Sequence, residues 1–207
     1  MPGKADPEKQ ASFLNDTLMP TINKAKAGLI ELFFVDASHF VMGGLPCRLW
    51  GKVRYWVKTS SGRKRYNVLG ALNFVSKKIE TIANDSYITS TQVVELLENI
   101  AFKYISKPIT IILDNARYQH CNYVINRAAE LGVQLIFLPT YSPNLNLIER
   151  VWKFVKSQVL NAAYIETFAD YCSMISNFVE TIETEHADQM LSLITEKFQL
   201  FNKYKVL

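Results

Sequence analysis

Residues 108–156, PITIILDNARYQHCNYVINRAAELGVQLIFLPTYSPNLNLIERVWKFVK, alternate twice between a short apolar run and a segment with helical spacing. The run ITIIL is continuously apolar and ends at Asp114, which is typical of a buried strand. The next segment, from Tyr118, has apolar residues on one helical face and ends before Gly132, a residue common just past a helix end. The run VQLIFL then leads through a proline-bracketed loop into an amphipathic helix that carries Glu149. This order predicts parallel strands flanked by helices.

The preceding part of the chain predicts further strands. The apolar run LIELFFV, residues 29–35, predicts a buried strand that delivers Asp36 at its carboxyl end. The stretches LWGKVRYWV and KRYNVLGALNFV, separated by Ser60, Ser61 and Gly62, predict two strands joined by a hairpin-like loop. The remaining expected elements are a helix over 7–27 that Pro20 breaks or kinks, a strand over 78–83, a helix over 90–104 and a last helix after Thr167.

These elements predict an α/β fold with a mixed five-stranded sheet flanked by helices and an extra C-terminal helix. We expect three parts: an N-terminal helical lead-in over 1–28, a core over 29–165 and a C-terminal helical extension over 166–207. The apolar fraction of 49% and the charged fraction of 20% are those of a globular chain.

Composition also limits the class of protein. The net charge of +4 is compatible with a polyanionic partner but does not identify one. The three cysteines are odd in number and widely spaced, which predicts reduced thiols. The first ten residues are polar, and no apolar run reaches the roughly 18 residues that span a bilayer. We therefore expect a cytoplasmic protein without a membrane partner.

Three acids follow or flank the predicted strands. Asp36 and Asp114 come directly after apolar runs, and Glu149 lies in the first turns of a helix that follows a third run. Sites in open α/β sheets form beyond the carboxyl ends of strands, so these acids could meet at one edge. Grouped carboxylates repel one another unless a divalent cation neutralises them, and oxygen ligands suit Mg²⁺ or Mn²⁺. Taken singly, each acid has an ordinary alternative: a helix cap for Asp114, a turn residue for Asp36 and a solvated surface group for Glu149.

Three sequence blocks carry a family resemblance. They are FFVDASHF around Asp36, IILDNARYQH around Asp114 and LPTYSPNLNLIERVWKFVK around Glu149. Together they resemble the mariner-like transposase superfamily in its bacterial insertion-sequence branch, which comprises DDE endonucleases with an RNase H-like catalytic domain. The 34 residues between Asp114 and Glu149 match the spacing characteristic of that superfamily. One departure is Leu147, where many relatives have proline; this change is expected to loosen the start of the helix.

The resemblance implies a catalytic and metal-binding triad of Asp36, Asp114 and Glu149 that holds two Mg²⁺ or Mn²⁺ ions. It implies cleavage of transposon ends and strand transfer into target DNA. The implied partners are double-stranded DNA and further copies of the chain, in a homodimer or a larger synaptic assembly. Relatives carry helix-turn-helix domains ahead of the catalytic domain, so an upstream-encoded DNA-binding polypeptide could supply this function. The alternatives are another RNase H-like nuclease or integrase, or an inactive remnant that binds DNA.

Several polar and basic residues are candidates for DNA contact. Lys153 and Lys156 follow Glu149 at i+4 and i+7, on the same helical face, although a surface ion pair is an equal alternative. Basic side chains also surround the loop at Ser60–Gly62, interleaved with aromatic residues, where solvation alone is the competing explanation. The full set of candidates is Asn115, Arg117, His120, Tyr141, Ser142, Asn146, Lys153, Lys156, Lys58, Arg63, Lys64 and Arg65.

Overall fold

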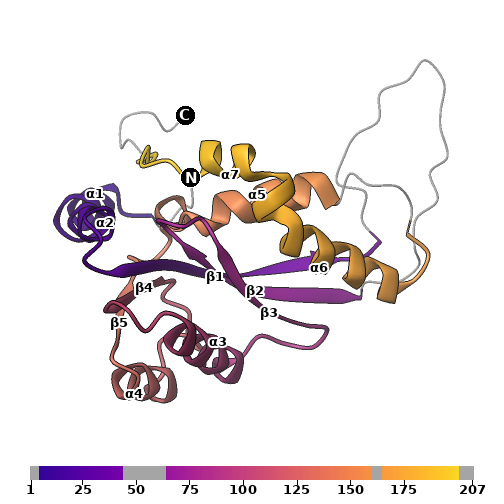
Figure 1. The fold of residues 1–207 in the computed structure, drawn as a ribbon, viewed down its shortest axis with the longest axis horizontal. Coiled ribbons are helices and arrows are strands. Elements are labelled where there is room, and N and C mark those ends of the chain that lie inside the picture. Colours follow the sequence, from indigo (N-terminus) through magenta and orange to yellow (C-terminus); the bar gives the residue numbers. More distant parts are fainter. Residues whose placement is uncertain (1–4, 44–63, 160–164, 201–207) are drawn as a thin grey trace.

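The computed structural model describes residues 5–43, 64–159 and 165–200. A central sheet separates two helical layers, with α3 and α4 on one face and α5, α6 and α7 on the other (Figure 1). The α1 and α2 helices lie at the end of the sheet where β1 begins.

The sheet is mixed and five-stranded, as the sequence predicts. Its order is β3-β2-β1-β4-β5. The central strand β1 pairs antiparallel with β2 and parallel with β4, and β5 extends the parallel half. The strands are β1 (Glu31–Val41), β2 (Arg65–Asn73), β3 (Ile79–Asn84), β4 (Ile109–Leu113) and β5 (Val133–Phe137).

The helices also follow the sequence pattern closely. The capping box predicted at the start of α3 is present, since Thr89 and Gln92 exchange hydrogen bonds across the first turn. Thr167 caps α6 in the same region of the chain where we expected the last helix. The helices are α1 (Pro7–Phe13), α2 (Met19–Lys26), α3 (Ser90–Lys103), α4 (Asn122–Glu130), α5 (Ile148–Val159), α6 (Phe168–Glu185) and α7 (Ala187–Leu193).

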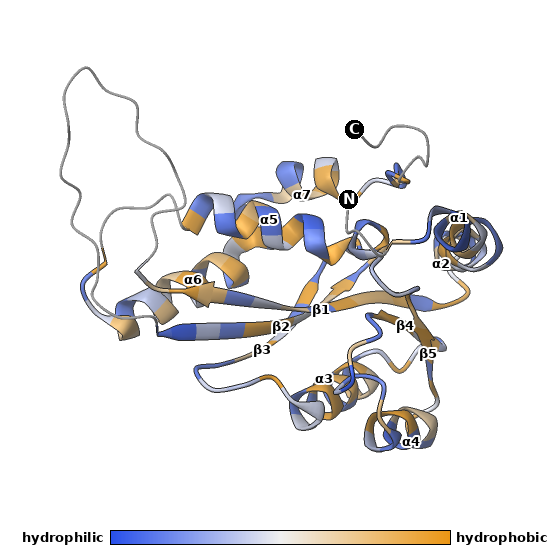
Figure 2. Cartoon of the chain, turned by 180° about the vertical axis from the view of Figure 1, so that it is seen from behind, coloured by the Kyte–Doolittle hydropathy of each residue, from blue (hydrophilic) through white to orange (hydrophobic). Residues whose placement is uncertain are grey.

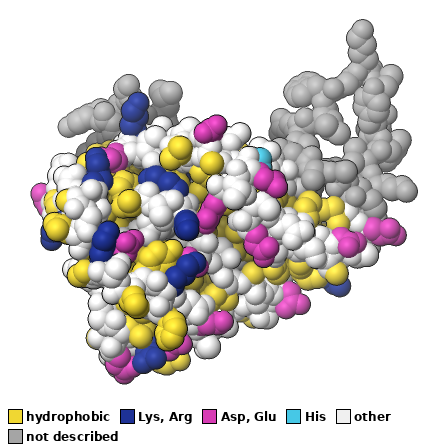
Figure 3. Space-filling view, viewed as in Figure 1, with side chains coloured by type: hydrophobic (Ala, Val, Ile, Leu, Met, Phe, Trp, Pro, Cys, Tyr) yellow, Lys and Arg dark blue, Asp and Glu magenta, His cyan; other side chains and the backbone are white. Residues whose placement is uncertain are grey.

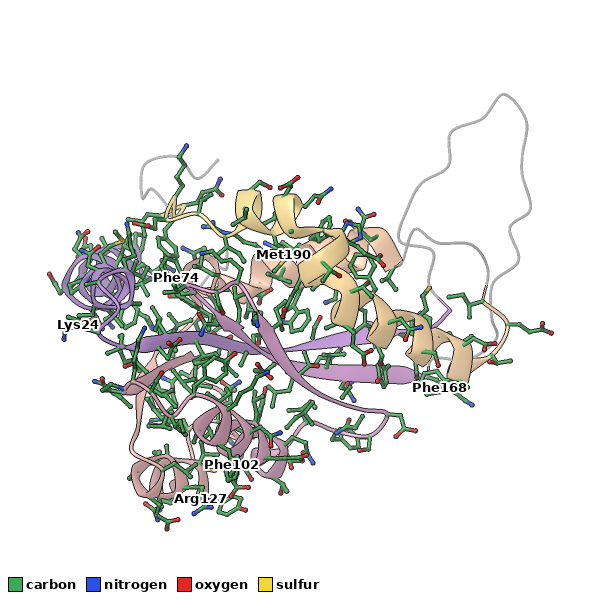
Figure 4. All side chains as sticks on the ribbon, in the orientation of Figure 1. Lys24, Phe74, Phe102, Arg127, Phe168 and Met190 are labelled. Atoms are coloured by element: carbon green, nitrogen blue, oxygen red, sulfur yellow. The ribbon has the colours of Figure 1, made fainter. Side chains whose placement is uncertain are left out.

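The two faces of the sheet bury two separate apolar clusters. Alternate side chains of β1 point to opposite faces, so Leu32 and Phe34 join the cluster under α5, α6 and α7, while Phe33 and Val35 join the one over α3 and α4. Figure 2 shows the apolar sides of these helices turned toward the sheet. Figure 4 places Met190 of α7 and Phe102 of α3 on opposite sides of it. The first cluster also contains Leu18, Ile22 and Ala25 from the N-terminal helices.

Three expected boundaries differ from the structure. Pro20 does not break the N-terminal helix: because proline lacks an N–H, the preceding turn widens into the π-helical segment η1 (Leu14–Leu18), and the helix continues as α2. The helix expected from Tyr118 begins only at Asn122, after a turn. The single last helix is divided at His186 into α6 and α7.

The hairpin expected around Ser60 can be assessed only in part. The strand predicted at LWGKVRYWV lies outside the described residues, whereas the second stretch forms β2 and pairs with β1 and β3. None of the helices in the described ranges combines the length and apolar character needed to cross a bilayer.

Candidate active site

The strand register brings Asp36 beside Asp114. The parallel pairing of β1 with β4 runs to Val35 and Leu113, so the next residue on each strand is an aspartate. We expected Asp36 at the carboxyl end of its strand. This expectation is wrong, because β1 continues to Val41 along the antiparallel partner β2. Asp36 therefore lies where β4 ends, while its own strand is still held by hydrogen bonds to β2. Asp36 is therefore held more rigidly than a residue in a loop.

A glycine on β2 allows α5 to approach Asp36. Gly70 is the register partner of Asp36. A Cβ atom built on Gly70 would lie 2.5 Å from Cζ2 of Trp152 and 3.0 Å from Cδ1 of Ile148, both in α5. The absence of a side chain at Gly70 thus makes the hollow into which the α5 residues pack. Because Glu149 follows Ile148, this close packing also determines how near Glu149 comes to the aspartates.

The charges of Asp36, Glu149 and Asp114 interact, as the pKa shifts of Asp36 and Glu149 indicate. Burial raises the pKa of Asp36 well above its usual range, and the charges of Glu149 and Asp114 raise it further. Burial also raises the pKa of Glu149, and Asp114 adds to that increase. Lys153 and Lys156 act in the opposite direction on the pKa of Glu149, which agrees with their predicted position on the same helical face.

Asn146 connects three parts of the site. Its side-chain Nδ2 donates to the Val35 carbonyl at 3.0 Å and to Oδ1 of Asp114 at 3.3 Å. Its own carbonyl accepts the backbone N–H of Glu149 at 3.3 Å. Burial raises the pKa of Asp114, and the hydrogen bond from Asn146 opposes this increase. We expected Asn146 to contact DNA. Because it is 1% exposed, it lies under the surface, where it is placed to orient the Asp114 carboxylate instead.

The loop before α5 borders a pocket of about 400 Å³ next to Asp114. Asn115 and Tyr141 line this pocket and are exposed, whereas Ser142, which also lines it, is 4% exposed. Arg117 is exposed on the turn after β4. His120 is also exposed, and its ring lies 4.3 Å from that of Phe137, centroid to centroid. Asn115, Tyr141 and Ser142 therefore share a pocket with Asp114, whereas Arg117 and His120 lie farther along the turn that follows it.

The basic candidates divide into two groups. Lys153 is exposed and Lys156 is half-buried on α5, beside the acids. Lys64 and Arg65 are exposed at the start of β2, and Lys64 Nζ lies 5.4 Å from the ring centroid of Phe168. Lys58 and Arg63 lie outside the described residues. On the face drawn in Figure 3, the described lysines and arginines are interspersed with acidic side chains.

Two residues near the acids were missed by reasoning from sequence. Gly70 looked like any strand glycine, although a glycine inside a strand can signal a close approach of another element. Tyr118 was assigned to a helical apolar face, but it lies in the turn after β4. Burial, together with the charges of Asp36 and Asp114, raises its pKa to about 12. Its phenol is therefore neutral at physiological pH and accepts a hydrogen bond from Nε2 of Gln119 at 3.4 Å.

Leu147 directly precedes α5. Its side chain is completely buried in the cluster under α5 and α6, so packing anchors the position where relatives have proline.

The donor set suits a hard cation, although it is not a preformed cage. The pKa values of all three carboxylates are raised. Asp36 lies on β1, Asp114 directly follows β4 and Glu149 lies on α5, and together they present the oxygen ligands that Mg²⁺ and Mn²⁺ prefer. Among residues 5–43, 64–159 and 165–200, no three His, Cys, Asp or Glu side chains already stand together as a metal shell. Mg²⁺ commonly takes one or two carboxylates and completes its shell with water and phosphate oxygens. The residues therefore fit such an ion bound together with a phosphodiester.

Comparisons with known proteins show the family of the chain. Residues 31–172 match the family described as DDE superfamily endonuclease. An uncharacterized 39 kDa protein of insertion element IS630 from Shigella sonnei is 24% identical over 135 residues, which cover 61% of this chain and 37% of that protein. The chain thus spans well under half the length of this curated relative.

Solved structures of transposases and integrases share the fold. The mariner Mos1 paired end complex with Mg superposes with a TM-score of 0.65 at 11% identity, covering 98% of this chain and 66% of that one. The catalytic domain of Mos1 gives a TM-score of 0.57 at 11% identity, covering 98% of this chain and 100% of that one. A chain of the simian T-cell lymphotropic virus intasome gives 0.54 at 17% identity, covering 76% and 50%. The expected RNase H-like fold is confirmed.

Proposed function

Since the chain belongs to the DDE superfamily endonucleases, on their mariner-like and IS630-like side, we propose that it is the catalytic domain of a DNA transposase. Its reaction would be metal-dependent cleavage of phosphodiester bonds at transposon ends, followed by strand transfer into target DNA. One observation carries the proposal. Asp36 on β1, Asp114 just after β4 and Glu149 on α5 interact electrostatically near the end of β4.

In this proposal, Asp36, Asp114 and Glu149 hold two Mg²⁺ or Mn²⁺ ions. Such ions, when bound, activate a water or 3′-hydroxyl nucleophile and stabilise the leaving oxygen of an in-line displacement. Asn146 fixes the orientation of the Asp114 carboxylate through Oδ1. Lys153 and Lys156 place positive charge beside Glu149, where it would attract the phosphate backbone. Tyr118 stays protonated and so adds no further negative charge to the group.

The proposed partners are double-stranded DNA and other copies of the chain. Relatives of this fold were solved as a paired end complex and as an intasome, which supports assembly around DNA ends. An upstream-encoded polypeptide of the helix-turn-helix class is a further proposed partner, for recognition of the transposon ends, and the proposed place of action is the bacterial cytoplasm at the nucleoid. Asn115, Arg117, His120 and Tyr141 are the proposed DNA contacts around Asp114.

A nicking assay on supercoiled plasmid with Mg²⁺ or Mn²⁺ tests the proposal. Asp114→Asn and Glu149→Gln should each lower the nicking rate by about 100-fold to 1000-fold, because each removes a charge that holds the ion. Glu95→Gln is the matched control, since Glu95 is exposed on α3 across the sheet. Circular dichroism should show all three variants folded. Wild-type rates in Asp114→Asn or Glu149→Gln would refute the assignment of the triad.

A second assay separates transposition from the alternatives. Oligonucleotides with a free 3′-hydroxyl end serve as donors for strand transfer into a plasmid. Joined products would identify a transposase or integrase, whereas nicking alone would indicate another RNase H-like nuclease. DNA binding without either reaction would identify an inactive remnant.

A further inference from the structure

The loop between β5 and α5 is held by a helix that lies outside the region of the family match. We propose that Gln10 of α1 is a positioning residue for this loop and, through the loop, for Asp114 and Glu149. The inference rests on the proposed function, because it takes those acids as the reacting centre. Gln10 precedes the matched residues 31–172 and would not be sought as part of the site.

The side chain of Gln10 is completely buried and both ends of its amide are used. Nε2 donates to the backbone carbonyl of Tyr141 at 3.3 Å. Oε1 accepts from Nδ2 of Asn144 at 3.1 Å. A glutamine is costly to bury unless its donor and acceptor are satisfied, and here the loop satisfies both. The two contacts are therefore specific to this loop conformation.

Asn144 extends the connection to the C-terminal segment. Its Nδ2 also donates to the backbone carbonyl of Gln199 at 2.8 Å. Nearby, Arg150 of α5 donates to the carbonyls of Thr195 and Lys197, each at 2.8 Å. Segments from both ends of the described chain thus fasten the loop and the first turn of α5.

This fastening acts on residues next to the acids. Tyr141 has a φ of +60°, a backbone conformation that a residue with a large side chain keeps only when its surroundings enforce it. The hydrogen bond from Gln10 ends on the carbonyl of this same residue. Further along the loop, Asn146 contacts Asp114 and precedes Glu149 by one helical turn. A shift of the loop would therefore move the pocket wall and the orienting amide together.

A positioning role predicts an effect on turnover without an effect on DNA affinity. Gln10 has no exposed surface and cannot touch DNA. We expect Gln10→Ala to lower the kcat of nicking by about 10-fold to 100-fold, the range that small misplacements of reacting groups produce. The Kd for plasmid DNA without metal, and the KM, should stay within about twofold of the wild-type values. Gln10→Glu should behave like Gln10→Ala, because it loses the donor to Tyr141.

The experiment compares Gln10→Ala, Gln10→Glu, Asn144→Ala and the Gln10→Ala/Asn144→Ala double variant, with Lys9→Ala as the matched control. Lys9 is exposed on the same helix, and its ammonium lies 3.6 Å from the Asp6 carboxylate at the surface, so its removal should leave turnover unchanged. The double variant should lose less than the product of the two single losses, because the two substitutions share the Gln10–Asn144 hydrogen bond. Thermal melts identify any variant that fails to fold, and Asn144→Ala, which removes the other partner of the Gln10 amide, then carries the test.

Hydrogen exchange at residues 140–146 gives a readout that does not depend on activity. Exchange there should become faster in Gln10→Ala and Gln10→Glu and stay unchanged in Lys9→Ala. Wild-type kcat and unchanged exchange in both Gln10 variants would overturn the proposal. If wild-type protein does not nick DNA, the proposed function fails instead, and faster exchange would still show that Gln10 holds the loop.

Discussion

At the scale of single residues, Asp36 bears the largest electrostatic cost of the proposed site. Burial and two neighbouring carboxylates raise its pKa well above the usual value for aspartate. In metal-free protein, the folded state therefore binds this proton more tightly than the unfolded state, so ionisation of Asp36 lowers stability as the pH rises through the raised pKa. Below the pKa of the unfolded chain this penalty is absent.

We predict that Asp36→Asn makes metal-free protein more stable at neutral pH, by roughly 1 kcal/mol or more, because the amide is uncharged. The same variant should not nick DNA. Thermal melts in EDTA between pH 4 and pH 8 measure the effect: the wild type should lose stability relative to Asp36→Asn as the pH rises. Adding Mg²⁺ or Mn²⁺ should stabilise only the wild type. Equal pH profiles for the two proteins would contradict the burial of a charge at this position.

Asn146 gives a second prediction at the same scale. Asn146→Ala removes the donor that orients Asp114 and should raise the Mn²⁺ concentration needed for half-maximal nicking by about 10-fold to 100-fold, as loss of an outer-shell partner commonly does. Titration calorimetry with Mn²⁺ gives the same comparison without DNA. Asn122→Ala, at an exposed position at the start of α4, is the control. An unchanged Mn²⁺ requirement in Asn146→Ala would leave Asn146 with a purely structural role.

The contrast between the acids and Asn146 shows what sequence can predict of a site. Asp36 and Asp114 follow apolar runs, and parallel strands bring their carboxyl ends to one edge, so the proximity of the two aspartates follows from pattern, while the inclusion of Glu149 depends mainly on the resemblance. Asn146 was predicted as a DNA contact because polar loop residues are usually exposed. Its actual position depends on the packing of Leu145 and Leu147 on either side, both completely buried, and neighbouring sequence does not specify that burial.

At the scale of elements, the distance between α5 and β2 determines where Glu149 lies. We predict that Gly70→Ala destabilises the protein by about 1–3 kcal/mol, the usual cost of overpacking, because the new methyl group would meet Trp152 at 2.5 Å. The displaced helix should carry Glu149 away from Asp36 and lower the nicking rate by about 10-fold or more. Urea unfolding and the plasmid assay measure the two effects.

Gly28→Ala separates the two effects of the Gly70 substitution. Gly28 has a φ of +75°, so alanine there strains the backbone, but its Cβ would meet only Lys107 Nζ at 3.8 Å, away from α5. This control should lose stability and keep the wild-type nicking rate at temperatures where it is folded. A similar loss of nicking in both variants would mean that stability, rather than the position of α5, limits activity.

Element boundaries were less predictable than element types. All five described strands were predicted as strands, but the length of β1 depends on its pairing with β2, which a short apolar run does not reveal. In the same way, Pro20 predicted a break or kink. Instead, a single wide turn accommodates the residue that lacks an N–H, because Leu18 and Ile22 on either side are buried in the core. Tertiary packing decided both outcomes.

At the scale of the whole molecule, the three parts expected from the sequence share one apolar cluster. Leu18 and Ile22 of the N-terminal helices and Tyr171, Ile175 and Ile182 of α6 are buried together with Trp152 of α5. Residues 29–165 include α5 but none of the other five side chains. The sequence pattern identified each helix as amphipathic, yet it could not indicate that their apolar sides meet over the same face of the sheet.

We therefore predict that residues 29–165 do not fold cooperatively as a separate chain. Burial of each large apolar side chain is worth about 1.5–3 kcal/mol. The loss of five such side chains thus approaches the whole stability of a typical domain, about 5–15 kcal/mol. Residues 5–200 form the matched control, because they retain every described contact and should melt in one transition. With Trp50 and Trp56 replaced by phenylalanine, Trp152 fluorescence reports on the cluster, since its indole is 1% exposed in the full fold. A cooperative melt of residues 29–165 near the temperature of residues 5–200 would instead establish the core as an independent domain, with the terminal helices as appendages.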